Sequence, residues 1–119
     1  MPVGRLGMAI ASGFSALGLL TNLTVLYLSS NNITGSIPDK LGDLKNLQYL
    51  DLSYNKLTGS IPSALGLLTN LRYLYLSSNN ITGPIPDKLG DLKNLQALDL
   101  GYNKLTGSIP SALGLLTNL

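Results

Sequence analysis

The 119-residue chain has no cysteine, histidine, tryptophan or glutamate, and it has a single phenylalanine. Without cysteine there is no disulfide, thiol nucleophile or thiolate ligand, and without histidine there is no imidazole for proton transfer or zinc binding. Two aspartates at equivalent positions, Asp51 and Asp99, suggest paired carboxylates, but nothing nearby in the sequence supports them as a hydrolytic pair. We therefore expect a non-enzymatic protein with no catalytic residue, no metal site and no cofactor.

Charge is also sparse. Charged residues make up 12% of the chain and the net charge is +2, spread without a basic stretch, so no nucleic-acid partner is expected. No apolar run approaches the roughly 18 residues of a membrane span. Arg5 and the apolar residues after it resemble a weak signal peptide, but the apolar stretch is too short. The segment 15–23 also repeats 63–71, so we expect the repeat array to begin within it.

Most of the chain consists of four copies of a 24-residue repeat, at 20–43, 44–67, 68–91 and 92–115, and residues 116–119 begin a fifth copy. A fixed period of this length predicts a solenoid. A second period of 48 residues lies over the first. Between residues 20–67 and 68–115 the only differences are Thr24/Arg72, Val25/Tyr73, Ser36/Pro84, Tyr49/Ala97 and Ser53/Gly101.

Each unit reads L-x-x-L-x-L-x-x-N-x-L followed by T-G-x-I-P-x-x-L-G-x-L. This resembles the leucine-rich repeat, in the plant-specific class known from extracellular receptor and inhibitor proteins. The resemblance implies an α/β solenoid with a parallel β-sheet on the concave face and short helical or 3₁₀ turns on the convex face. Residues 20–119 form this array, and residues 1–19 are expected to be a degenerate N-terminal cap or partial repeat.

Elementary physics agrees with this interpretation. Pairs of leucines such as Leu50 and Leu52 alternate with other residues, which predicts a short strand with one buried face. The Gly after each Thr permits a tight bend, and the Ile-Pro pair that follows predicts an extended segment. An asparagine follows each strand, and its amide can satisfy backbone groups where the chain turns inward. We expect these asparagines to form a structural ladder: Asn31, Asn55, Asn79 and Asn103.

In proteins of this kind the residues between the strand leucines face outward on the concave side. All six tyrosines of the chain fall at such positions. Tyrosine offers a large contact area with few rotamers to freeze, and it is enriched at binding surfaces. The simpler alternative is that these tyrosines are ordinary strand-surface residues that pair across strands. The candidate binding residues are Tyr27, Tyr49, Asp51, Tyr54, Tyr73, Tyr75, Asp99 and Tyr102.

Strand and residue spacings give this face about 260 Å². A standard protein interface needs about 800 Å² per partner, so the face suits a peptide or glycan better than a folded protein. We therefore expect an interaction scaffold for a protein, peptide or glycan ligand. The alternative is a structural protein whose uncapped ends stack head to tail into filaments. The missing cysteine caps, which members of the plant class usually carry, are the reason to keep this alternative.

Three N-x-T sequons start at Asn22, Asn32 and Asn80 and permit N-glycosylation of a secreted chain. The compartment is not determined, although the resemblance and the sequons favour an extracellular location. On the convex side, Leu67 and Leu115 replace the Asp of the other two units. We expect neighbouring turns to cover these leucines partly.

Overall fold

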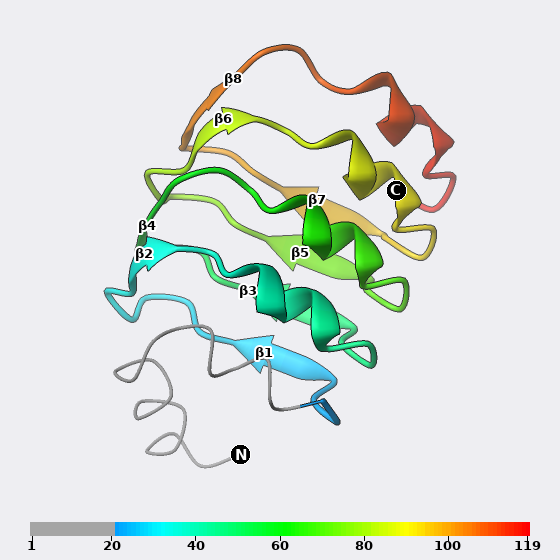
Figure 1. The fold of residues 1–119 in the computed structure, drawn as a ribbon, viewed down its shortest axis with the longest axis horizontal. Helices are drawn as coiled ribbons and strands as arrows, with labels where there is room; N and C mark the ends of the chain where they lie inside the picture. Colours follow the sequence, from blue (N-terminus) through cyan, green and yellow to red (C-terminus); the bar gives the residue numbers. More distant parts are fainter. Residues whose placement is uncertain (1–20) are drawn as a thin grey trace.

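The computed structural model describes residues 21–119. Within them the chain winds through four stacked coils, each with a strand of the main sheet, a second short strand and a 3₁₀ turn (Figure 1). The coils repeat every 24 residues, as the sequence period predicts, and the expected α/β solenoid is confirmed. The predicted cap or partial repeat at residues 1–19 lies outside the described residues.

The main sheet contains one strand from each coil, in the order β1-β3-β5-β7. All pairs are parallel, and each residue lies opposite the residue 24 positions further along, so that Leu26 faces Leu50 and Leu50 faces Leu74. These central leucines are buried, which confirms the strands predicted from the alternation. The strands are β1 (Val25–Tyr27), β3 (Tyr49–Asp51), β5 (Tyr73–Tyr75) and β7 (Ala97–Asp99).

A second set of strands was not predicted. The Thr-Gly segments of the first and third coils each pair in parallel with the Lys-Leu-Thr segment of the next coil, which gives two separate two-stranded sheets. Gly35 and Gly83 lie within these strands and Gly59 and Gly107 directly follow them. All four have φ between 72° and 84°, a backbone conformation that a Cβ disfavours. These strands are β2 (Thr34–Ser36), β4 (Lys56–Thr58), β6 (Thr82–Pro84) and β8 (Lys104–Thr106).

The 3₁₀ turns lie on the side of the solenoid opposite the main sheet (Figure 1). Each begins after the proline of the Ile-Pro pair, whose backbone is extended, as predicted. The turns pack so closely that a Cβ on Gly66 would lie 2.5 Å from the Lys88 carbonyl oxygen of the next coil. The turns are η2 (Asp39–Asp43), η3 (Ser63–Leu67), η4 (Asp87–Asp91) and η5 (Ser111–Leu115).

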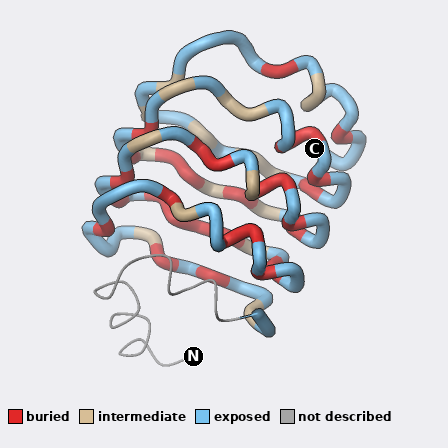
Figure 2. The backbone as a smooth tube through the Cα atoms, viewed as in Figure 1, coloured by how far each residue is buried: buried red, intermediate tan, exposed pale blue. Residues whose placement is uncertain are grey.

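The core runs through the middle of the stack as columns of leucine and isoleucine (Figure 2). Each coil buries its apolar side chains against the coils above and below, so stability comes from contacts between neighbours. Burial falls off in the fourth coil, where Ile109 is 76% exposed although its counterpart Ile37 in the first coil is 4% exposed.

Three asparagines of the expected ladder, Asn55, Asn79 and Asn103, form hydrogen bonds with the backbone of the preceding coil. Asn55 is the clearest case: its Oδ1 accepts hydrogen bonds from the backbone N–H groups of Asn31 and Ile33, and its Nδ2 donates to the Leu28, Leu52 and Ser53 carbonyls. A second asparagine column was missed. Its side-chain amides donate to the backbone carbonyl of the residue 25 positions earlier, at Asn46, Asn70, Asn94 and Asn118.

Candidate functional site

Four tyrosines gather on the outward face of the main sheet, which we call the sheet face. They form what we call the tyrosine cluster, made of Tyr27, Tyr49, Tyr73 and Tyr75. The ring centroid of Tyr49 lies 6.2 Å from that of Tyr27 and 5.6 Å from those of Tyr73 and Tyr75. Tyr73 and Tyr75 stack at 6.4 Å. The register explains the gathering, since Tyr49 and Tyr73 are directly paired neighbours on adjacent strands.

The cluster combines exposed and packed surface. Tyr27 is exposed, and the other three side chains are half-buried against one another. The Tyr73 hydroxyl donates a hydrogen bond to Gln96 Oε1 at 3.0 Å, which holds this ring across two coils. Burial raises the pKa of the Tyr49 phenol above its ordinary value, and the negative charge of Asp51 adds to the shift. The cluster is thus a preformed aromatic surface with polar groups attached.

Asp51 departs from the expectation that it points freely outward. This residue is only 7% exposed, and its side chain forms hydrogen bonds with a residue two positions further along the chain. Its Oδ1 accepts hydrogen bonds from the Ser53 backbone N–H and the Ser53 hydroxyl. The carboxylate lies between Tyr27 and Tyr75 in the register of the sheet, on the same strand as Tyr49. It therefore sits at the base of the tyrosine cluster.

Of the other three candidate residues, Asp99 lies at the edge of the cluster beside Tyr75, and Tyr54 and Tyr102 lie away from it. Asp99 occupies the same column as Asp51 but is exposed in the fourth coil, with Tyr75 between the two aspartates. Tyr54 and Tyr102 follow their strands and have φ of 57° and 53°, a left-handed conformation unusual for a non-glycine residue. Both rings are exposed and neither forms an aromatic pair with the cluster. The structure thus brings five of the eight candidates together.

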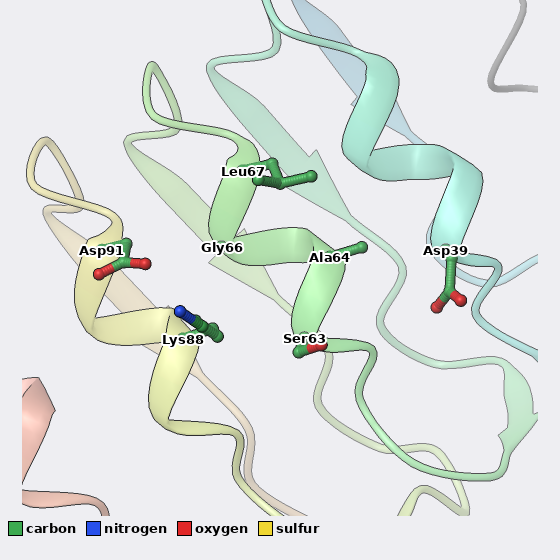
Figure 3. Close-up of a pocket in the computed structure, with 7 residues that line it drawn as sticks. All are labelled: Asp39, Ser63, Ala64, Gly66, Leu67, Lys88 and Asp91. Carbon is green, nitrogen blue, oxygen red and sulfur yellow. The ribbon is translucent and has the colours of Figure 1, made fainter.

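The turn side carries an open depression of about 300 Å³ (Figure 3). Three successive turns line it: Asp39 comes from η2, Leu67 from η3, and Lys88 and Asp91 from η4. Leu67 is 53% exposed, so neighbouring turns cover about half of this side chain, in agreement with the expected partial cover. Its side chain extends from the end of η3 toward η2 and lines the depression (Figure 3). Leu115 in the fourth coil is exposed as well.

The sequon asparagines Asn22, Asn32 and Asn80 are all exposed, and their glycosylation stays a prediction. Within residues 21–119 no three potential metal-ligating side chains come together. None of the helices in this part of the chain has the length and apolar character needed to cross a membrane.

Stacked 24-residue coils with a parallel sheet on one side, 3₁₀ turns on the other and a buried asparagine ladder define a leucine-rich solenoid. Comparison with known families agrees. The leucine-rich repeat family matches residues 21–81, and a pattern of two repeat copies from the same family matches residues 69–113. The chain belongs to the leucine-rich repeat family, and the resemblance found in the sequence is confirmed. Among curated proteins, none matches the chain.

Solved structures of plant proteins share the fold. A plant peptide hormone receptor, RGFR1 in complex with RGF2, is 42% identical with a TM-score of 0.87, over 88% of this chain and 17% of the receptor. A plant ice-binding protein is 40% identical with a TM-score of 0.81, over 86% of this chain and 33% of its own. The BIR3–SERK2 complex from Arabidopsis thaliana is 44% identical with a TM-score of 0.79, over 83% and 53%. This chain spans about half of the last protein and much less of the other two.

Proposed function

We propose that this chain is a non-enzymatic recognition module that binds a peptide or protein segment across the sheet face. The observation that carries the proposal is the tyrosine cluster. Three strands present four aromatic rings within 5.6 to 6.4 Å of a neighbouring ring, on a face that no element of residues 21–119 covers. Aromatic anchors of this kind dominate the energetics of many interfaces, because they bury large area at small entropic cost.

Similar proteins support a peptide or protein as the ligand class. One similar structure is a peptide hormone receptor in complex with RGF2, and another is the receptor kinase HAESA in complex with the peptide hormone IDA and the co-receptor SERK1. The face also has a suitable size. Four strands at about 4.8 Å spacing span about 15 to 20 Å, the length of an extended peptide of about five or six residues.

The test replaces Tyr49, Tyr73 and Tyr75 together by Ser and measures capture of peptides from a displayed random library. We expect the triple variant to fold and to lose capture, because the aromatic area that anchors the ligand is gone. Tyr54→Ser is the matched control, since its ring is exposed but lies outside the cluster. Capture by the triple variant at the level of Tyr54→Ser would refute the proposal. If the wild-type protein binds glycans on an array and captures no peptide, the ligand class is glycan instead of peptide.

Head-to-tail assembly is a second candidate. It is favoured by apolar side chains that are exposed at the end of the array although their counterparts in earlier coils are buried, Ile109 and Leu119. A further coil would cover part of this apolar surface, as the second coil covers Ile37 of the first. Light scattering after size-exclusion chromatography tests it over a range of concentrations. Growth in mass with concentration supports assembly, and a mass that stays at that of one chain of 12.6 kDa contradicts it.

A further inference from the structure

The tyrosine cluster surrounds a carboxylate that has no cation. Asp51 Oδ1 accepts both hydrogen bonds from Ser53, and Oδ2 accepts none among residues 21–119. Nor does any Lys or Arg in this part of the chain form an ion pair with it. Removing an ionised carboxylate from water is costly unless a counter-charge compensates it. The two hydrogen bonds compensate only Oδ1, and Oδ2 keeps some contact with solvent, through which a hydrogen-bond donor can reach it.

The neighbours of Asp51 are aromatic on three sides. Tyr27 and Tyr75 flank it across the sheet, and Tyr49 precedes it by two residues on the same strand and face. The negative charge reaches these rings, since it helps to raise the pKa of Tyr49. Aromatic faces attract cations through their quadrupole, and a carboxylate beneath them adds a full charge of the same sign. Both features select positive charge.

The fourth coil shows that this arrangement is specific to Asp51. Asp99 has the same place in its repeat, and its Oδ1 accepts the equivalent hydrogen bond from the Gly101 backbone N–H. In the sheet register Tyr75 lies on one side of it, and two residues earlier its strand carries Ala97, where the second coil has Tyr49. Asp99 is exposed to water, whereas Asp51 is nine-tenths buried. Water can therefore hydrate the Asp99 carboxylate without a counter-charge.

We infer that Asp51 and the tyrosine cluster together form a pocket for the guanidinium group of an arginine in the bound peptide. The inference rests on the proposed function and adds the chemical class of the side chain that the sheet face selects. A flat guanidinium stacks on an aromatic face and donates hydrogen bonds to a carboxylate in one geometry. A lysine ammonium has no flat face, so it makes only part of these contacts.

The test begins with peptides selected on the wild-type protein from a random 12-residue library. We expect one position to be enriched in arginine. Replacing that arginine by citrulline, which keeps the shape and removes the charge, is expected to weaken binding by about 10- to 100-fold, as for other desolvated charge pairs. Replacement by lysine is expected to cause a smaller loss.

The protein side uses Asp51→Asn and its matched control Asp99→Asn. The amide oxygen that Asp51→Asn introduces can still accept both Ser53 hydrogen bonds, so the fold is expected to persist, which a melting curve checks. Asp51→Asn should lower the affinity for the arginine peptide by about 10- to 100-fold and leave the affinity for the citrulline peptide at the wild-type level. Asp99→Asn should change the affinity for the arginine peptide less than about twofold.

Three outcomes overturn the inference: no arginine enrichment, equal binding of the arginine and citrulline peptides, or equal losses in the two Asn variants. In each of these the proposed function survives, because peptides are still captured. If no peptide is captured at all, both the arginine pocket and the proposed function are refuted. If Asp51→Asn does not fold, the affinities of the wild type for the arginine and citrulline peptides still test whether the pocket selects the guanidinium charge.

Discussion

The asparagine ladder yields the sharpest prediction about stability, and Asn55→Ala tests it. The substitution removes five hydrogen bonds, but most of the affected groups keep a partner or reach water. The Leu52 carbonyl still accepts from Asn79, the Ser53 carbonyl still accepts from the Ser30 N–H, and Asn31 is exposed. Two buried groups are left with nothing: the Ile33 N–H and the Leu28 carbonyl.

An unpaired buried polar group costs about 1–3 kcal/mol, so Asn55→Ala should lose about 2–6 kcal/mol. This is a large share of the roughly 5–15 kcal/mol of a whole domain. Asn79→Ala serves as the graded control. It orphans only the Leu57 N–H, because Asn55 and Asn103 still donate to the Leu52 and Leu76 carbonyls, so about 1–3 kcal/mol is expected.

The assay is denaturant unfolding followed by circular dichroism, with the free energy of unfolding taken from the midpoint and slope. The free energy of unfolding should be highest for the wild type, lower for Asn79→Ala and lowest for Asn55→Ala. Equal losses in the two variants would show that the count of orphaned groups does not govern the cost. An unchanged midpoint for Asn55→Ala would contradict the structural role of the ladder altogether.

Two further predictions follow from the stack and from the cluster. Gly66→Ala should destabilise the fold by about 1–3 kcal/mol through overpacking, since the new Cβ would meet the Lys88 carbonyl. Gly114 has the same repeat position, but a Cβ there meets nothing within 4 Å, so Gly114→Ala should be neutral or stabilise the fold by up to about 1 kcal/mol. Thermal melting of both variants checks this, and equal effects on the two melting temperatures would contradict it. The Tyr49 phenol should titrate above its ordinary pKa of 10.0, and Asp51→Asn should lower that pKa, as followed by ¹³C NMR of labelled tyrosine. Because the folded pKa is raised, the contribution of Tyr49 to stability is complete below the ordinary pKa of 10.0 and is lost as pH rises through the folded pKa. A Tyr49 pKa unaffected by Asp51→Asn would show that the carboxylate does not act on the ring.

Much of the fold could be predicted because the repeat carries redundant signals. Leu26, Leu50 and Leu74 recur with the alternation of a strand, and the structure buries all three. Asn55 and Asn79 recur at the point where the chain must turn inward, so their hydrogen-bonding role could be inferred from the sequence. In each case the period determined which residues become neighbours, since stacking places equivalent residues side by side.

The second set of strands could not be predicted in the same way. Segments such as Thr34–Ser36 contain glycine and exposed polar residues, which have little strand preference of their own. They pair only because stacking of the coils brings Thr34–Ser36 beside Lys56–Thr58 of the next coil.

The sequence by itself determined the solenoid, its period, the asparagine ladder and the columns in which the tyrosines lie, because repetition at a constant spacing leaves little freedom in how coils stack. Only the tertiary structure decided which members of these columns form a site. Asp51 and Asp99 have nearly the same local sequence, yet one is buried among tyrosine rings and the other is in water. The physical reason is that burial and charge compensation depend on neighbours contributed by other coils, and these differ between the second coil and the fourth.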